Sequence, residues 1–340
     1  LIFVFFFTRE LLGARAAWLA LVLATFDPNL LANTRLVTTD LGLTCFLVGA
    51  VWFLWSWLKK PTALNLIMAG LLAGLTMGAK FTGLMIWPIA LLIALIYPAT
   101  GLRTYWAELG RRLLALLSIG LIGYAVLWAL YRFDVGTAAG LPWQLPLPAP
   151  FYWQEFWTTF NRIVGLDDIR LNYFKGETSP GGWWNYAFVA LAVKTPLPTL
   201  ILTATGVITL FWRKQARTQV VLWAAPLAFL LLGATGILSI GYRHTLPALP
   251  FLIMLAGNST AWLAAENPKR TLALVAQGAL VFWLIVGTLR FFPHHESYFN
   301  ETAGPWQNWS EILVDSNLDW GQDLPALRDT MAELDIERVN

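Results

Sequence analysis

The 340-residue chain is 57% hydrophobic and only 13% charged, and it contains 19 Trp, 21 Phe and 9 Tyr. A water-soluble domain carries about 25% charged residues, so this composition excludes an ordinary soluble protein and indicates a membrane protein. The formal net charge of +3 is small and the basic residues are dispersed, which argues against a nucleic acid as partner. The single cysteine, Cys45, excludes an intramolecular disulfide framework and a cysteine-ligated metal site.

Apolar segments recur along the whole chain. A helix that crosses a bilayer needs about 20 mostly apolar residues. The chain opens directly on the apolar run LIFVFFF, without a charged region or a cleavage site, so we read no signal peptide and expect a fragment that begins inside a span, at residues 1–8. The other candidate spans are residues 12–28, 41–58, 63–79, 82–98, 113–131, 185–212, 219–238, 246–264 and 271–289.

Basic residues divide the loops between these spans into two sets. Cytoplasmic loops retain Lys and Arg, and alternate loops hold twelve of them, whereas the opposite short loops hold only Arg35, Lys80 and Arg243. The pattern predicts that the side with twelve basic residues is cytoplasmic. These residues are Arg9, Arg15, Lys59, Lys60, Arg103, Arg111, Arg112, Arg213, Lys214, Arg217, Lys269 and Arg270.

Two stretches do not have the composition of membrane spans. Residues 132–184 form a predicted long outer loop, in which LPWQLPLPAP is followed by the amphipathic run FYWQEFWTTFNRIVGL, typical of a helix that lies in the membrane interface. Residues 290–340 are rich in charge and predict the start of an extracytoplasmic soluble segment. We therefore expect a transmembrane region over residues 1–289, followed by this segment.

Asp40 is an ionisable residue at the predicted outer end of the span that begins at Leu41. Ionisable groups at membrane depth are costly and mark candidate functional sites. One interpretation is a helix-capping acid, in keeping with Thr38 and Thr39 just before it. The other is a carboxylate that faces a water-filled cavity and binds a metal or an acceptor. The residues alone leave both interpretations open.

Three basic residues occur at the outer ends of predicted spans. Lys80, in GLTMGAKFTGL, is either a point charge for a phosphate or a lysine that extends its ammonium to the membrane boundary. Lys194 interrupts the run FVALAVKTPLPTL, where Pro196 and Pro198 break the helix, and a broken helix at membrane depth needs protein or water around its backbone. Arg243 suits either bidentate phosphate recognition or an interfacial belt. Together the three cations favour an anionic ligand.

Two motifs near the C-terminal end contain histidines and acids. His294 and His295 are adjacent and would point in different directions on a regular element, so we expect surface exposure rather than joint metal binding. Asp315, Asp319 and Asp323 recur at four-residue spacing, which would gather three carboxylates on one helical face. A turn around Ser316 and Asn317 that caps a following helix is the alternative.

Five segments, in chain order, resemble those of a known family. They are NTRLVTTDLGLTCFL, AGLLAGLTMGAKFTGL, YFKGETSPGGWWNYAFVALAVKTPLPTL, GYRHTLPALPFL and YFNETAGPWQNWSEILVDSNLDWGQDL. Together they resemble the bacterial phospholipid-carrier-dependent glycosyltransferases of family 39, relatives of the protein O-mannosyltransferases and of the lipid A aminoarabinose transferase. The resemblance covers almost all of the chain.

The resemblance implies an all-α integral membrane protein, a multi-span helical bundle of the GT-C type in the bacterial inner membrane. It implies an active site that faces outward, where a sugar passes from a polyprenyl-phosphate carrier, usually with inversion, to a protein, lipid or glycan acceptor. A cation near the leaving phosphate suits this reaction, because it stabilises developing negative charge. A divalent metal assists some relatives, and no certain cofactor is implied here.

The resemblance also assigns roles to residues of the predicted site. Asp40 matches the second acid of the family's active site. Lys80, Lys194 and Arg243 fall in motifs that lie near the phosphate of the carrier lipid.

The resemblance has two further implications, one for the outer loop and one for the catalytic base. Glu177 and Tyr186 belong to the outer-loop motif that covers the site in the family. The catalytic base of the family is an acid in the first outer loop, which we expect upstream of Leu1, so residues 1–340 by themselves are expected to lack it.

A polytopic secondary transporter for an anionic solute is the alternative function. Interrupted helices with charges at mid-depth are typical of such transporters. Transporters of this kind usually contain two related halves, however, and the sequence contains no internal repeat. The long outer loop and the outer soluble segment favour an enzyme at the membrane surface.

Overall fold

The structure is a computed structural model that describes residues 1–36, 38–99, 101–141, 145–163, 171–236, 239–264 and 268–338, with the backbone alone at residues 102, 103 and 163. Helices dominate these residues, and the strands among them form two short antiparallel pairs, β1 (Val135–Gly136) with β2 (Leu147–Pro148) and β3 (Asn172–Phe174) with β4 (Glu177–Ser179). The predicted fold class, an all-α membrane bundle, is confirmed.

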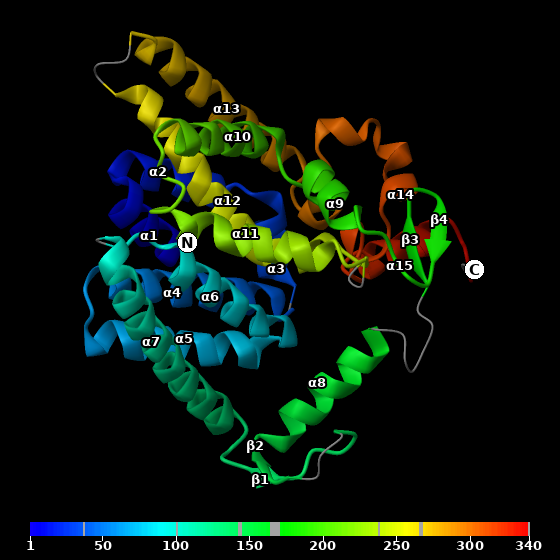
Figure 1. Cartoon of the computed structure of the whole chain (residues 1–340). Helices are drawn as coiled ribbons and strands as arrows, with labels where there is room; N and C mark the ends of the chain where they lie inside the picture. Colours follow the sequence, from blue (N-terminus) through cyan, green and yellow to red (C-terminus); the bar gives the residue numbers. More distant parts are fainter. Residues whose placement is uncertain are drawn as a thin grey trace.

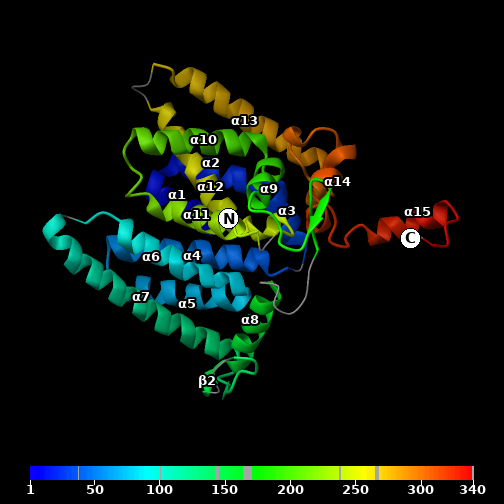
Figure 2. The same ribbon diagram turned by 45° about the vertical axis from the view of Figure 1, so that its right-hand side comes forward.

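Apolar helices run side by side through the body of the molecule (Figures 1 and 2). Within the described residues, four helices are long and apolar enough to cross a membrane, or five if one bent pair counts as a span. The helices of the body are α1 (Ile2–Leu12), α2 (Ala14–Thr25), α4 (Asp40–Lys59), α5 (Ala63–Ala79), α6 (Ile86–Ile96), α7 (Leu102–Leu130), α10 (Leu197–Trp212), α11 (Val220–Gly233), α12 (Leu249–Ala256) and α13 (Arg270–Arg290).

Most predicted spans correspond to these helices. The prediction for residues 63–79 coincides with α5, and the prediction for residues 41–58 matches α4 within one residue at each end. The candidate span at residues 185–212 is broken instead into α9 (Tyr186–Lys194) and α10, which are inclined by 113°. The break follows from Pro196 and Pro198, because proline lacks the N–H group that a continuous helix requires.

Glycines allow α5 and α7 to pack with their backbones close together. A Cβ atom added to Gly74 would lie 2.5 Å from the carbonyl oxygen of Gly123, so only glycine fits there. Gly70 and Gly78 face α7 in the same way, one turn before and one turn after. Small residues at four-residue spacing are typical of close helix pairs in membranes. This packing fixes the end of α5, which Lys80 follows directly.

The two ends of the bundle differ (Figure 2). At one end the chain turns from α1 to α2, from α4 to α5 and from α10 to α11, and these turns carry predicted cytoplasmic basic residues, so we call it the basic-loop end. The opposite end, which the sequence predicts to be the outer one, is called the outer end below. It gathers α3 (Pro28–Arg35), α8 (Pro150–Ile163), α9, α14 (Trp309–Ile312) and α15 (Leu324–Glu333).

The predicted soluble segment packs onto the outer end before it departs from it. Phe299, Asn300 and Asn317 are buried, whereas α15 has no buried residue. The division of the chain after residue 289 stays a prediction. In the predicted outer loop, α8 forms where the amphipathic run was expected, while residues 142–144 and 164–170 of that loop, and residues 339–340, lie outside the described residues.

Candidate active site

Asp40 and Lys80 form an ion pair at the outer end of the bundle. Asp40 lies in the first turn of α4, and Lys80 follows the last residue of α5 in an extended conformation. The Lys80 Nζ lies 2.5 Å from Oδ1 of Asp40, and the two side chains are 20% and 2% exposed. The pair joins residues 40 positions apart, and neither interpretation of Asp40 from sequence anticipated it.

The local backbone directs the Lys80 side chain toward Asp40. After Lys80 the chain forms a 3-10 helix at Phe81–Met85 that folds back on the end of α5. A Cβ atom on Gly83 would lie 2.1 Å from the backbone oxygen of Thr76, so glycine is required for this fold. The close approach at Gly83 is therefore to another part of the backbone.

Arg243 lies beside the pair, in the 3-10 helix Tyr242–His244. Its guanidinium carbon lies 4.0 Å from the centre of the Trp320 ring, a cation–π contact. Its Nε is buried without a hydrogen-bond partner among the described residues. The charge of Arg243 is close enough to act on Lys80. A planar cation held by one face, with a buried donor left over, is suited to receive an anion.

Glu296 joins the same group of charges from the C-terminal segment. Burial raises the pKa of the Glu296 carboxyl above its ordinary value, and the positive charges of Lys194 and Arg243 oppose that rise. The negative charge of Asp40 also acts on Glu296. Sequence reasoning missed Glu296, because FFPHHES reads as a polar surface segment. We refer to Asp40, Lys80, Arg243 and Glu296 as the charged cluster.

Lys194 is held by the protein itself. Its side chain is buried, and Nζ donates to the backbone carbonyl oxygens of Glu296 and Asn317, both at 2.6 Å. The ammonium also lies 4.8 Å from the centre of the Phe299 ring. Two of its three N–H groups are therefore engaged in fastening the C-terminal segment to α9. The phosphate role predicted for Lys194 stays a prediction, and the contacts seen here are structural.

Asn317 connects the elements around the cluster. Its Oδ1 accepts from the backbone N–H of Tyr242 at 2.9 Å, and its Nδ2 donates to the Tyr186 hydroxyl at 2.9 Å. The side chain is fully buried. Because Arg243 follows Tyr242 directly, Asn317 fixes the backbone that presents the guanidinium. The sequence suggested Asn317 only as part of a turn, and these contacts were not predicted because its partners lie far away along the chain.

Asp27 is a second acid that the sequence did not single out. It is fully buried and caps α3, with Oδ1 accepting from the backbone N–H groups of Asn29 and Leu30. Burial raises the pKa of Asp27 from 3.8 to about 7, against the lowering effect of these hydrogen bonds and of the nearby Lys194 charge. Its Oδ2 has no hydrogen-bond partner within the described part of the chain. Asp27 therefore fixes the start of α3.

The two residues assigned to a cover over the site differ in position. Tyr186 is buried at the start of α9 and receives the hydrogen bond from Asn317. Glu177 is exposed on β4, in the hairpin that β3 and β4 form. The roles of Tyr186 and Glu177 in covering the site stay predictions.

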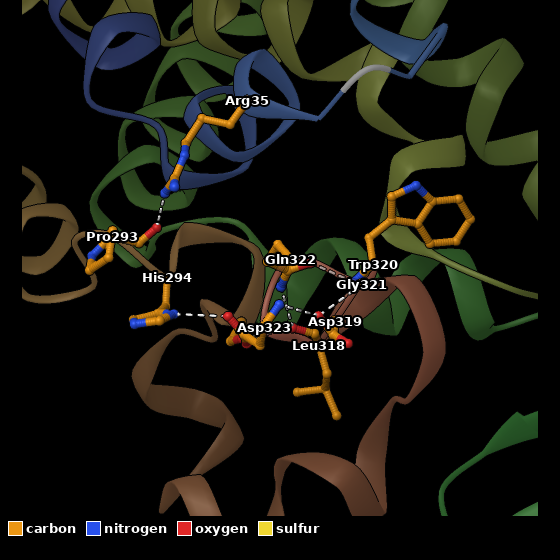
Figure 3. A network of polar contacts seen from close by, with 10 residues as sticks. Arg35, Pro293, His294, Leu318, Asp319, Trp320, Gly321, Gln322 and Asp323 are labelled. Atoms are coloured by element: carbon orange, nitrogen blue, oxygen red, sulfur yellow. Dashed lines mark hydrogen bonds and ion pairs between the residues drawn. The ribbon is translucent and has the colours of Figure 1, made fainter. Parts of the chain in front are cut away.

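The three regularly spaced acids do not share a helical face. Asp315 lies in a separate 3-10 helix, whereas Oδ1 of Asp319 accepts from the backbone N–H groups of Gly321 and Asp323 (Figure 3). The alternative, a turn around Ser316 and Asn317 that caps the following helix, is also wrong, because Asn317 lies in that 3-10 helix and the N-cap of α15, Asp323, makes no side-chain capping bond. The Trp320 ring points away from the turn at residues 319–323 (Figure 3). Among the described residues, no group of three His, Cys, Asp or Glu side chains could hold a metal ion.

The two histidines lie in different environments. His294 is exposed and its Nδ1 lies 3.2 Å from Oδ1 of Asp323 (Figure 3). His295 is buried, with its ring packed edge-to-face on Phe292. The expectation of surface exposure is therefore right for His294 and wrong for His295, because the C-terminal segment folds back onto the bundle. Whether they bind a metal jointly stays a prediction.

The charged cluster combines two kinds of chemistry at one end of a membrane bundle. Lys80 and Arg243 provide positive charge for an anionic group, and preorganised cations stabilise charge that develops on a leaving phosphate. Asp40 and Glu296 provide carboxylates that can orient a hydroxyl or accept a proton. Such a combination suits group transfer from a phosphate-bearing donor.

Comparisons with known proteins support this interpretation for the first part of the chain. The sequence model of the dolichyl-phosphate-mannose-protein mannosyltransferase family matches residues 1–124, which include Asp40 and Lys80. No curated protein and no solved structure matches the chain. The family match supports a membrane glycosyltransferase, similar to mannosyltransferases, that uses a polyprenyl-phosphate sugar donor.

Proposed function

We propose that the chain transfers a sugar from a polyprenyl-phosphate carrier to an acceptor at the outer face of a bacterial inner membrane, with inversion at the anomeric carbon. The observation that carries this proposal is the charged cluster, in which Lys80 pairs with the buried carboxylate of Asp40 and the charge of Arg243 acts on Lys80 and Glu296 at one end of the bundle. The acceptor is a hydroxyl or phosphate group on a protein, lipid or glycan.

In the proposed reaction an acceptor oxygen attacks the anomeric carbon of the sugar. The bond between that carbon and the phosphate oxygen breaks, and its electron pair leaves with the polyprenyl phosphate. Lys80 and Arg243 stabilise the negative charge that collects on this phosphate. The acceptor proton passes to a carboxylate, while Asp40 acts as the second acid that orients the acceptor.

The proposal gives the carrier lipid a defined orientation. Its apolar tail lies among the apolar helices, so only the phosphate and the sugar need polar partners. Lys194 supports the site by holding the backbone of Glu296 and Asn317 in place. Its third N–H group is the one through which it would approach the phosphate. A secondary transporter is not favoured, since the family match points to a transferase.

Binding of polyprenyl phosphate tests the proposal, because the proposed reaction releases this product whichever sugar it transfers. Full-length protein in detergent micelles would be titrated with polyprenyl phosphate, and the phosphorus NMR signal of the ligand would report binding. We expect Lys80→Met and Arg243→Met each to weaken binding about tenfold or more, because a hydrogen bond to a charged group is worth about 1.5 to 3 kcal/mol.

Lys60→Met is the matched control for these variants. Lys60 is an exposed cation that follows the last residue of α4, at the end of this helix opposite Asp40. Its removal should leave the affinity unchanged. Equal affinities for wild type, Lys80→Met and Arg243→Met, in folded protein, would contradict the proposed phosphate site.

A further inference from the structure

A polar cavity opens at the basic-loop end, opposite the charged cluster. It has a volume of about 380 Å³, within the range of small-molecule sites. It lies between the turn from α1 to α2, the segment after α10 and the 3-10 helix Gly257–Leu263. The proposed glycosyl transfer makes no use of this cavity.

Two arginines give the cavity a positive charge. Arg15 and Arg213 both line it, and no acidic side chain is among the described residues that do so. Nη1 of Arg15 donates to the backbone oxygen of Leu263 at 3.2 Å, which holds the guanidinium at the cavity wall. An arginine has five N–H donors, so most of the Arg15 donors remain for a ligand.

The start of α2 adds a second source of positive potential. Gly13 is the N-cap of this 12-residue helix and provides no side-chain hydrogen bond. Its φ of +92° is a conformation that favours glycine. Gly13 and Ala14 line the cavity, so the first backbone N–H groups of α2 lie at its wall. Backbone donors at a helix start bind anions, phosphates in particular.

A row of amide side chains forms the remaining polar wall. Nε2 of Gln219 donates to Oε1 of Gln215 at 2.9 Å, and Nδ2 of Asn258 donates to Oε1 of Gln219 at 2.8 Å. Gln219 and Asn258 are buried and fixed by these bonds. Because Oε1 of Gln215 is used in the row, its Nε2 is the group that can donate to a ligand. The wall therefore offers donors rather than negative charge.

We propose that this cavity binds a phosphate-bearing anion, either the headgroup of an anionic phospholipid or a free phosphate. Two guanidinium groups, an uncapped helix start and fixed amide donors together match the charge and the acceptor oxygens of a phosphate. The cavity lies at the basic-loop end, which the sequence predicts to be cytoplasmic. Basic pockets between membrane helices on the cytoplasmic side bind lipid headgroups.

Binding by the full-length protein in neutral detergent tests the inference. The probes are short-chain phosphatidylglycerol, inorganic phosphate and, as the zwitterionic comparison, short-chain phosphatidylcholine, each titrated with native mass spectrometry as readout. We expect Arg15→Gln and Arg213→Gln each to raise the Kd about tenfold or more, since a charge-assisted hydrogen bond is worth about that factor. Arg217→Gln, in the same loop but not at the cavity, should bind as wild type does.

The results separate the two ligands and can overturn the inference. Tight binding of phosphatidylglycerol alone identifies a headgroup, and binding of inorganic phosphate identifies a free phosphate, provided that either depends on Arg15 and Arg213. Equal binding by these variants and by Arg217→Gln, equal affinity for phosphatidylcholine, or no binding of either anion would overturn it.

A further variant decides the matter if the arginine variants do not fold. Ala261→Leu narrows the cavity and keeps both charges. Loss of anion binding in this variant would support the inference, and unchanged binding would overturn it. Binding of polyprenyl phosphate at the outer end is measured on the same proteins, so failure of one site is distinguishable from failure of the other.

Discussion

Removing Asp40 and removing Lys80 from their ion pair should lower the stability of the protein by unequal amounts. Removing one partner of a buried ion pair costs about 3 to 5 kcal/mol, because the other charge stays buried without compensation. Lys80 is 20% exposed, so after Asp40→Asn its ammonium can turn to water. Asp40 is 2% exposed, so after Lys80→Met its carboxylate cannot. The start of α4 compensates that carboxylate only by about 0.3 to 1 kcal/mol.

We therefore expect Lys80→Met to lower the free energy of unfolding by about 3 kcal/mol and Asp40→Asn by about 1 kcal/mol. The double variant removes both charges and should be more stable than Lys80→Met alone. The free energies would come from reversible denaturant titration in micelles, combined in a double-mutant cycle. A coupling energy of about 1 to 3 kcal/mol is expected for groups in contact. Additive effects of the two changes would refute the reasoning.

The same variants separate stability from function. Asn has the shape of Asp and can still accept a hydrogen bond, but it supplies no negative charge. Asp40→Asn should therefore lower sugar transfer at least about 100-fold, the lower end of the contribution of a positioned acid or base. The double variant should be more stable than Lys80→Met but should not transfer sugar. Near wild-type transfer by Asp40→Asn would leave Asp40 with a structural role only.

Further predictions concern the support of the site and its sidedness. Lys194→Met should destabilise the protein by about 3 kcal/mol and expose the C-terminal segment to protease, because two carbonyl oxygens lose a charged donor. Asp27→Asn should stabilise the protein: with a pKa raised from 3.8 to about 7, wild type loses stability as pH rises through that window. The thermal stability of Asp27→Asn relative to wild type should increase from pH 3.8 to about 7 and stay constant above that pH. Cysteines placed at the exposed positions Thr178 and Ser310, after Cys45 is replaced, should react with an impermeant reagent in intact cells; labelling that needs opened membranes would contradict the predicted topology.

The helices of the body could be predicted from sequence because each is an apolar run with a polar boundary. The span at residues 63–79, for example, lies between KKPT and Lys80, and it matches α5. The break near Lys194 was also legible, since Pro196 and Pro198 exclude a continuous helix. The angle between α9 and α10 was not, because it depends on what each half packs against.

The contacts of the candidate site could not be predicted in the same way. Asp40 and Lys80 stood out as charges at membrane depth, but their pairing joins two helices and has no signal in either one. Lys194 binds carbonyl oxygens that lie more than 100 residues further along the chain. Asp27 lay inside a run predicted as a span, although an acid followed directly by proline is a signal for a helix start.

Photo-crosslinking with a polyprenyl phosphate that carries a diazirine next to its phosphate tests the central claim most directly. The probe would be bound to the full-length protein in proteoliposomes, irradiated and mapped by peptide mass spectrometry. The account predicts crosslinks to residues next to Asp40, Lys80 and Arg243, suppressed by excess unlabelled polyprenyl phosphate and by Lys80→Met. Crosslinks confined to the cavity at the basic-loop end, or insensitive to competition, would contradict it.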